Sequence, residues 1–175
     1  MPELVEPAVR FRASWMQACQ EWGPGAHQDG SGLRLAGPDL DSAAGFEAWV
    51  ERLRAQADRS LALPQDRVHA THLWIVQDGT YLGAIDVRHR LNALLLEGGG
   101  NIGYSVRPSA RRRGHATWAL GRVLPVARDL GLERVLLTCD DGNTPSARTI
   151  EANGGVLEDV RATALGLKRR YWITL

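Results

Sequence analysis

Residues 42–63 carry apolar side chains at intervals of three or four, which is the spacing of one face of an α-helix. The apolar positions of this face are Phe46, Trp49, Val50, Leu53 and Ala57. Asp41 or Ser42 directly precedes them and can accept hydrogen bonds from the first free amides of a helix. The pattern therefore predicts a helix over about 42–63. A shorter helix is predicted over Ser14–Trp22, capped by Ser14, and a glycine-rich connection, Gly23–Gly37, joins the two.

After residue 68 the apolar pattern changes to that of strands. Two segments, 69–77 and 81–90, flank Asp78-Gly79, which favours a two-residue hairpin because both residues tolerate positive φ. Further strands are predicted over 101–106, 134–139, 156–160 and 168–175, and further helices over 116–130 (ended by Gly131) and 145–153. The order of elements is β, α, α, β, β, β, α, β, α, β, β. This order predicts an α/β fold, a mixed sheet with helices packed on it.

Length and composition fit one soluble globular domain over residues 1–175. The chain has 175 residues, of which 44% are hydrophobic and 23% charged. No apolar run approaches the ~20 residues of a membrane span, and residues 1–10 lack the apolar segment of a signal peptide. Cys19 and Cys139 lie far apart without metal-type spacing, so reduced thiols in a cytoplasmic protein are the simplest interpretation.

The charge is nearly balanced, with 21 basic and 20 acidic side chains and a formal net charge of +1. Lys168 is the only lysine, so the other basic side chains are arginines. Such a balance gives no global field that attracts DNA, RNA or an anionic membrane. Nucleic-acid binding through Arg107 and Arg111–Arg113 is disfavoured further because no aromatic residues are interleaved with these arginines. The sequence predicts neither a nucleic-acid nor a membrane partner.

The pattern Arg111-x-x-Gly114-x-Ala116 lies between a predicted strand and a predicted helix. The first amides of a helix have no internal partners, and the helix dipole places partial positive charge there, so a pyrophosphate can bind them. Gly114 lets a phosphate approach the backbone closely, and Arg111, Arg112 and Arg113 supply cationic donors. As a bare pattern, the segment also fits a solvated arginine-rich turn before an ordinary helix.

The same pattern resembles motif A of the GNAT superfamily of acyl-CoA-dependent N-acyltransferases, Arg/Gln-x-x-Gly-x-Gly/Ala. The flanking segments resemble this family as well: 101–108 its fourth strand, 134–139 its fifth, and 143–154 the asparagine-led helix that follows. The resemblance covers about residues 82–161, and the order and spacing of its parts agree. It implies the GNAT fold, a central, mostly antiparallel sheet that is splayed between strands four and five and flanked by helices.

The resemblance implies acetyl-CoA as cosubstrate and no metal. In the family the pantetheine arm lies between strands four and five, the pyrophosphate binds the first amides of the helix, and the amine attacks the thioester without a covalent enzyme intermediate. The residues carried over for cofactor binding are Ser105, Val106, Arg111, Arg112, Arg113, Gly114, His115, Ala116, Thr117, Asn143, Ser146 and Arg148. His69 and His72 do not suggest a metal either, because residues three apart on a strand point to opposite faces.

Two departures from the family concern proton transfer. Ile150 stands where many members have a tyrosine that protonates the leaving thiolate, and Asn101 where many have a glutamate that acts as base. A CoA thiolate resembles that of a cysteine, with a pKa of ~8.5, so an acid is not essential. The nearest acidic residues by strand position, Asp86 and Glu97, are the candidates for the base, followed by His89. Asp86 and Glu97 are equally compatible with plain surface carboxylates.

The predicted function is the transfer of an acetyl group from acetyl-CoA to an amine. The missing tyrosine and glutamate leave a second interpretation, a non-catalytic module that binds acyl-CoA. The acceptor stays open among small amines, amino acids, antibiotics, peptide N-termini and protein lysines. Acceptor specificity is expected from the N-terminal helices and Gly23–Gly37, where the resemblance is weakest, and Trp22 is a candidate for lining the acceptor pocket. A homodimer is compatible with a small soluble enzyme.

Overall fold

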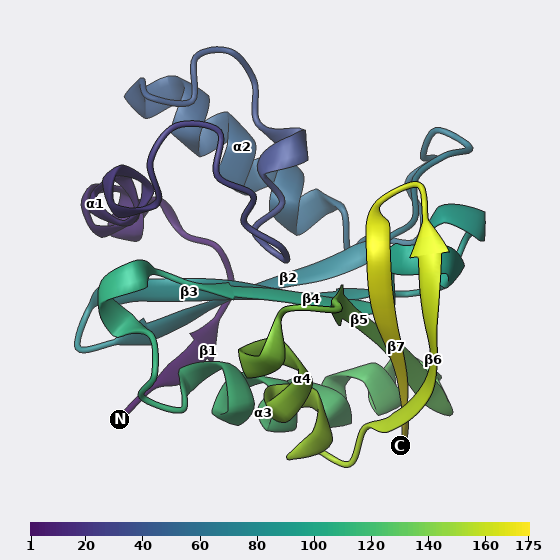
Figure 1. The fold of residues 1–175 in the computed structure, drawn as a ribbon. Helices are drawn as coiled ribbons and strands as arrows, with labels where there is room; N and C mark the ends of the chain where they lie inside the picture. The colour runs from purple at the N-terminus through teal and green to yellow at the C-terminus, as the bar shows by residue number, and fades with distance from the viewer.

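The computed structural model describes residues 1–175 and contains two antiparallel sheets with helices packed on them (Figure 1). The four-stranded sheet has the order β1 (Glu3–Val5), β2 (Ala70–Gln77), β3 (Thr80–Arg88) and β4 (Ile102–Val106). The three-stranded sheet has the order β5 (Arg134–Asp140), β7 (Gly166–Thr174) and β6 (Val156–Thr163). The principal helices are α1 (Arg12–Trp22), α2 (Ala43–Ala55), α3 (His115–Asp129) and α4 (Thr144–Glu151). The predicted α/β fold and the predicted order of elements are confirmed.

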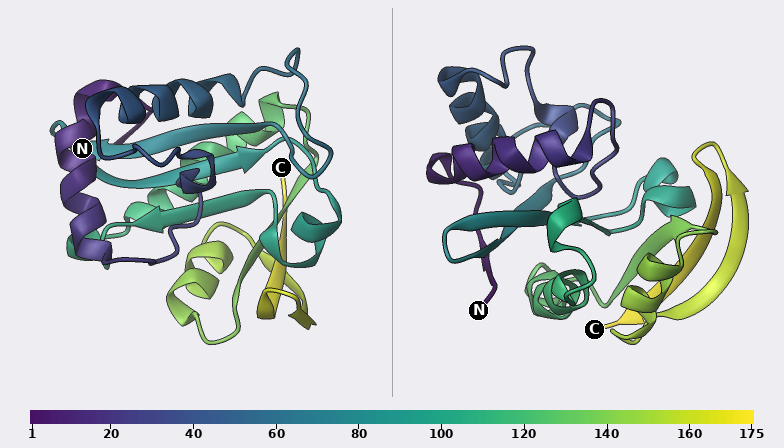
Figure 2. Two further views of the ribbon diagram at one scale, coloured as in Figure 1. Left: turned by 90° about the horizontal axis from the view of Figure 1, so that it is seen from above. Right: turned by 60° about the vertical axis from the view of Figure 1, so that its left-hand side comes forward.

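The helices form two layers, one on each side of the four-stranded sheet (Figure 1). α1 and α2 cover one face, and α3 and α4 lie on the other side, where α3 packs against β3 and β4 and α4 packs against α3 and β5. The hairpin of β6 and β7 projects at the end of the molecule away from α1 (Figure 2). Short helical turns connect the elements: η1 (Val9–Phe11), η2 (Leu33–Leu35), η3 (Leu95–Gly99) and η4 (Pro108–Ala110).

Aromatic side chains fill the core beneath α1 and α2. The ring centroids of Trp15 and Trp49 lie 4.9 Å apart, and that of Trp74 on β2 lies 5.9 Å from that of Trp49. Phe46 packs against all three of these indoles. Each of these four side chains is at most 2% exposed, which removes a large apolar area from water, worth about 1.5–3 kcal/mol for a side chain such as Phe. The apolar face predicted from the spacing in 42–63 is therefore the core face of α2.

The helix boundaries differ from the prediction at both N-terminal helices. Ser42 caps α2 as predicted, because its Oγ accepts from the amide of Gly45 (2.9 Å). α2 ends at Ala55 instead of residue 63, since Gln56 is tied to β2: its Nε2 donates to the carbonyl of Val68, and its own carbonyl accepts from the Ala70 amide. Ser14 was wrongly predicted as the cap of α1. The helix begins at Arg12, and the Ser14 hydroxyl accepts from the amide of Tyr81 on β3.

The hairpin at Asp78-Gly79 is confirmed, with φ values of 52° and 73°. The C-terminal hairpin is longer than predicted, because β6 continues to Thr163 and β7 starts at Gly166. A register shift between Leu157 and Asp159 marks a bulge in β6. The short strand β1 pairs with β2 and anchors the N-terminus on the edge of the larger sheet.

The two sheets are joined at Asn101 and separate beyond it. The backbone amide of Asn101 donates to the carbonyl of Leu136 on β5 (2.6 Å), and its side-chain Oδ1 accepts from the Leu136 amide (2.8 Å). Its Nδ2 donates to the carbonyl of Arg88 on β3 (3.2 Å). No ladder pairs β4 with β5. The two strands therefore face each other with free edges, which is the splay that the family resemblance implies.

Candidate active site

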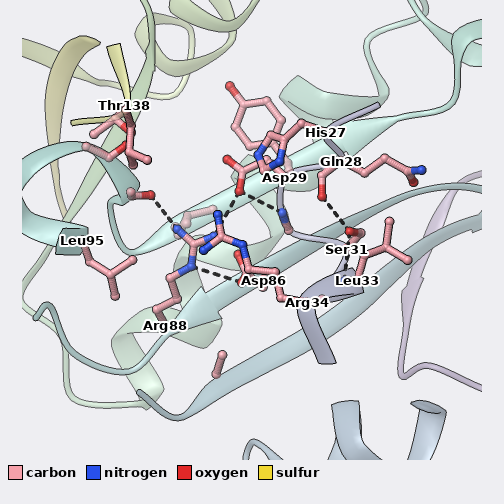
Figure 3. A pocket seen from close by; sticks show the side chains of 18 of the residues that line it. His27, Gln28, Asp29, Ser31, Leu33, Arg34, Asp86, Arg88, Leu95 and Thr138 are labelled. Atoms are coloured by element: carbon pink, nitrogen blue, oxygen red, sulfur yellow. Dashed lines mark hydrogen bonds and ion pairs between the residues drawn. The ribbon is translucent and has the colours of Figure 1, made fainter. Parts of the chain in front are cut away.

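A cavity of about 1370 Å³ opens between the glycine-rich loop (Gly23–Gly37), the ends of β2 and β3, and the gap between β4 and β5. Tyr104, Cys139 and Ser146 line its side toward the gap, and Lys168 on β7 lies at its margin. Figure 3 shows the part nearest the loop, where polar side chains from the loop and from β3 point toward one another. The cavity therefore connects the N-terminal helical layer with the splay.

The guanidinium group of Arg88 connects three segments at the floor of this cavity (Figure 3). Its Nε donates to Asp86 Oδ2 (3.2 Å) on the same strand, and its Nη2 donates to Asp29 Oδ1 (3.0 Å) on the glycine-rich loop. Its Nη1 donates to the carbonyls of Gly99 (2.5 Å) and Gly100 (3.3 Å) at the end of η3. The Arg88 side chain is only 15% exposed. Because charge-assisted bonds to carboxylates are strong, Arg88 fixes the loop and η3 relative to the sheet.

The glycine-rich loop lies close to the sheet because its glycines leave room. A Cβ at Gly30, where φ is 73°, would collide with the carbonyl oxygen of Gly103 on β4. A Cβ at Gly103 would in turn collide with Asp29 Oδ1 and lie 2.8 Å from Arg88 Nη2. The loop is also held by the Trp49 indole, which donates to the carbonyl of Gly32 (3.1 Å). The segment has no regular strand or long helix, but its position is specified by packing and hydrogen bonds.

His72 on β2 lies beneath the loop and is 6% exposed. Its Nε2 is 2.6 Å from Gln56 Oε1, and because Gln56 Nε2 donates to Val68, the amide oxygen faces the imidazole. Nε2 therefore carries the proton, and Nδ1 has no hydrogen-bond partner. Burial lowers the pKa of His72 below its usual value, so the ring is neutral at pH 7.

The structure places the two predicted proton acceptors differently. Asp86 is 5% exposed and lines the cavity, with Oδ1 accepting from the Gly103 amide (2.9 Å) and Oδ2 from Arg88. Glu97 is an exposed residue of η3 and is not part of the cavity wall. His89 lies outside this cavity, where its Nδ1 accepts from Arg59 Nε.

The turn before α3 has the geometry of an anion site. Arg112 and Gly114 have φ values of 62° and 79°, and a Cβ at Gly114 would meet no atom within 4 Å. The first amide of this helix that donates to a backbone carbonyl is that of Trp118, bonded to the carbonyl of Gly114 (2.9 Å). The amides of residues 113–117 therefore remain free at the positive end of the helix dipole. Free amides of this kind can bind an anion, and the binding of a pyrophosphate here stays a prediction of the motif.

The side chains around this turn have separate environments. Arg111 Nε donates to the carbonyl of Val106 (3.1 Å), and its guanidinium lies 4.4 Å from the centre of the Trp22 ring. Trp22 is not part of the cavity wall, which differs from its prediction as an acceptor-pocket residue; it supports Arg111 instead. Burial and the nearby Arg113 lower the pKa of His115, so this imidazole is neutral at pH 7.

The other predicted cofactor residues lie on both sides of the gap. Ser105 and Val106 are buried on β4, where they pair with β3 and leave the opposite backbone edge facing β5. Across the gap, Asn143 Oδ1 caps α4 by accepting from the Ser146 amide (3.2 Å). Both Asn143 and Ser146 line the cavity, whereas Arg148 is exposed and makes no side-chain hydrogen bond. The structure thus brings β4 and the start of α4 together around one gap.

Two hydroxyl groups meet where the cavity enters this gap. Tyr104 Oη on β4 is 2.8 Å from Ser146 Oγ on α4, and burial raises the pKa of Tyr104 above its usual range. Cys139 beside them is 6% exposed, as expected of a small core residue, and burial raises the pKa of its thiol. Ile150, at the position of the family's tyrosine, is fully buried. Sequence reasoning assigned no function to Tyr104 or Asp29, because their contacts join distant segments and leave no local pattern.

Comparison with known proteins gives a family and a set of similar folds. The acetyltransferase (GNAT) domain family matches residues 15–156, which is most of the chain. An acetyltransferase from Salmonella typhimurium that modifies the N-terminal serine of ribosomal protein L7/L12 is 16% identical, with a TM-score of 0.68, over 99% of this chain and 95% of that chain. The RimJ protein of Mycobacterium smegmatis, in complex with a CoA-disulfide, is 21% identical, with a TM-score of 0.69, over 99% of this chain and 81% of that chain.

A microcin C7 self-immunity acetyltransferase, in complex with acetyl-CoA and AMP, is 16% identical, with a TM-score of 0.66, over 99% of this chain and 92% of that chain. At these identities the similarity concerns the fold. No curated protein sequence matches the chain. None of the helices combines the length and apolar character that crossing a membrane requires.

Proposed function

The chain belongs to the GNAT acetyltransferase family, and we propose that it transfers the acetyl group of acetyl-CoA to a primary amine held beside the glycine-rich loop. The observation that carries this proposal is the splay: a cavity reaches the gap between two strands that face each other with unpaired edges. The free amides before α3 support it, because a pyrophosphate fits there without displacing any atom at Gly114. The thioester of acetyl-CoA supplies the acetyl group.

The proposed cofactor contacts follow from what each residue leaves free. The open edge of β4 at Ser105 and Val106 is proposed to pair with the pantetheine arm. Because backbone groups alternate between the two sides of a strand, those of Ser105 point to β3 and those of Val106 face the gap. The Val106 carbonyl also accepts from Arg111 Nε, so its amide is the group left free for the pantetheine. The amides of residues 113–117 bind the pyrophosphate, and Arg112 and Arg113 contribute charge. Asn143 uses its oxygen to cap α4, so its amide nitrogen is the atom that can donate to the pantetheine. Arg111 and Arg148 approach the phosphates from the two sides of the gap.

The Tyr104–Ser146 hydroxyl pair is proposed to face the leaving thiolate. Ile150 has no proton to give, whereas Ser146 Oγ lies on the cavity wall and is bonded to Tyr104 Oη. Because the thiolate has a pKa of ~8.5, this hydroxyl pair assists its departure and is not indispensable. Asp86, one of the two residues predicted as the base, is proposed to contribute charge on the acceptor side of the cavity. Glu97, the other, stays a prediction, and none of its contacts supports it.

The proposed acceptor is a primary amine on a molecule that can enter an open cavity. A volume of about 1370 Å³ exceeds what a small alkylamine fills, so a peptide N-terminus is the first acceptor to test. The Salmonella typhimurium enzyme modifies an N-terminal serine, which also favours testing a peptide N-terminus first. We also propose a cytoplasmic location, because both cysteines are free thiols. A homodimer stays a prediction.

The test is a measurement of CoA release from acetyl-CoA with a panel of peptide N-termini, lysine derivatives and small amines, beside a direct measurement of acetyl-CoA binding. Release that depends on an amine supports transfer. Binding of acetyl-CoA without release for any amine would instead identify a non-catalytic acyl-CoA-binding module. Failure to bind acetyl-CoA would contradict both.

A further inference from the structure

Asp29 presents a carboxylate at the point where the glycine-rich loop touches β4. Its Oδ1 accepts from the Gly30 amide (3.0 Å) and from Arg88 Nη2 (3.0 Å), while its Oδ2 accepts no hydrogen bond. The side chain is 40% exposed and lines the cavity. Figure 3 shows it beside Arg88, between His27 and the strand. Arg88 thus fixes one oxygen of Asp29 and leaves the other available to a ligand.

This carboxylate lies directly against the face of Gly103. Only a residue without a Cβ fits there, since a Cβ at Gly103 would collide with Asp29 Oδ1. Gly103 is two residues after Asn101. The family resemblance implies a glutamate that acts as the general base at the position of Asn101. Asn101 is fully used as the bridge between Arg88 and Leu136 and cannot accept a proton. Asp29 therefore brings a carboxylate from another segment to the start of β4.

Asp29 keeps a free carboxylate oxygen among groups of both charges. The ionised side chains nearest to it on the cavity wall are Asp86 and Arg88 from β3 and the exposed Arg34 from η2 (Figure 3). Arg88 is bonded to both carboxylates, whereas Arg34 forms no ion pair with Asp29, so Oδ2 of Asp29 is the free acceptor for a cation. His72 on β2 is neutral because burial lowers its pKa. The hydroxyl of Tyr104 on β4, which burial keeps protonated, and the exposed His27 on the loop complete the surroundings. A protonated amine that enters here meets an unpaired carboxylate oxygen.

We propose that Asp29 receives the ammonium group of the acceptor and takes its proton, directly or through one water molecule. This proposal rests on the proposed function. The proton moves from nitrogen to Asp29 Oδ2, and the neutral amine attacks the thioester carbon. A C–N bond forms, the C–S bond breaks, and the second N–H proton ends on the sulfur to give the CoA thiol. Asp29 then releases its proton to solvent. Because a carboxylate receives the acceptor, the proposed substrate class is a primary amine that enters as a cation.

Asp29→Asn is the main test. The amide oxygen can still accept the Arg88 bond, so the loop keeps its tether while the charge and the proton acceptor are lost. We expect kcat/KM for an amine that the wild type acetylates to fall about 10²–10⁴-fold. The rate should recover toward alkaline pH, where free amine is already present. Acetyl-CoA affinity should not change, because Asp29 is not among the proposed acetyl-CoA contacts.

Two further variants separate proton transfer from loop positioning. Asp39→Asn is the matched control: Asp39 lies on the same connection between α1 and α2, is exposed, and accepts hydrogen bonds only with its backbone carbonyl. It should keep wild-type kinetics. Arg88→Gln removes the tether instead, and it should raise the KM for the amine more than it lowers kcat.

Wild-type kcat/KM and pH dependence in Asp29→Asn would overturn the assignment and leave acetyl transfer intact. An alkaline shift in Asp86→Asn without one in Asp29→Asn would overturn it as well and assign the proton to Asp86. A wild-type protein that binds acetyl-CoA but releases no CoA with any amine would overturn the proposed function, and this proposal with it. These three outcomes are distinct.

Discussion

The turn before α3 and the glycine-rich loop are both irregular segments rich in glycine, yet they are held in different ways. The turn is local: Gly114 at a φ of 79° starts the helix, and the free amides follow from the helix geometry itself. The loop is held from a distance, since Asp29 depends on Arg88, which is 59 residues away in sequence. The proposed cofactor side therefore relies on backbone, and the proposed acceptor side on side-chain contacts that a few substitutions can change.

This difference suggests how the two sides respond to mutation. A site made of backbone amides tolerates most side-chain changes but fails when the backbone itself is distorted. In a site made of long-range ion pairs, single substitutions alter the geometry in small steps. Acceptor preference can therefore change while the proposed cofactor site is retained. The following predictions test that contrast, beginning with the largest effect.

Gly114→Val should abolish the stabilisation of the protein by acetyl-CoA. A branched residue is strained at a φ of 79°, and its Cβ would occupy the open space next to the free amides. A ligand at 100 times its Kd contributes about 2.7 kcal/mol to the wild type, which a thermal-shift titration detects. Gly131→Val is the matched control, because Gly131 has a φ of 89°, open surroundings, and a place at the far end of α3. Retained stabilisation in folded Gly114→Val would contradict the assignment of this turn.

Asn101→Ala should lower the free energy of unfolding by about 1–3 kcal/mol, because the Leu136 amide and the Arg88 carbonyl lose their partner at a site that is 2% exposed. Asn101→Glu should also be destabilising and should not raise kcat, since the position joins the sheets. Urea denaturation measures both, with the exposed Gln65→Ala as control. A faster enzyme with Glu at position 101 would show that the position is catalytic after all.

Ile150→Val should cost about 0.5–1.5 kcal/mol of stability and leave turnover nearly intact, because the side chain is a fully buried core residue. The measurement pairs thermal unfolding with steady-state kinetics on the same preparation. Loss of turnover at unchanged stability and unchanged acetyl-CoA affinity would reveal a catalytic contribution from α4 that its packing does not suggest.

The smallest effect concerns pH. His72 has a lowered pKa in the folded protein, so the unfolded chain, with a histidine pKa of ~6.5, takes up the proton first as pH falls. Its contribution to stability is complete above pH ~6.5 and is lost as pH falls from there toward the folded pKa. His72→Gln should therefore flatten the stability profile below about pH 6.5 relative to the exposed control His27→Gln. Equal slopes in the two variants would contradict the buried neutral state of His72.

The sequence predicts what depends on neighbours in the chain. The apolar spacing in 42–63, the Asp78-Gly79 turn and the Arg111–Ala116 pattern each specify their structure within a few residues, and the first two are confirmed by the fold. The end of α2 was wrong because Gln56 is bound by β2, a contact that no helix pattern contains. Asp29 and Tyr104 escaped prediction for the same reason, since each acquires its chemistry from a partner on another element.

The cluster of Trp15, Trp49 and Trp74 has a spectroscopic consequence. Indoles whose ring centroids lie 4.9 and 5.9 Å apart share their electronic excitation, so they give a strong near-ultraviolet circular dichroism signal that depends on their relative orientation. Trp49 also holds Gly32 of the glycine-rich loop through its indole N–H. The remaining three tryptophans belong to other regions: Trp22 lies against Arg111, Trp172 against Arg134, and Trp118 is on α3. The near-ultraviolet circular dichroism signal of this cluster therefore reports on the packing beneath the glycine-rich loop without an added label.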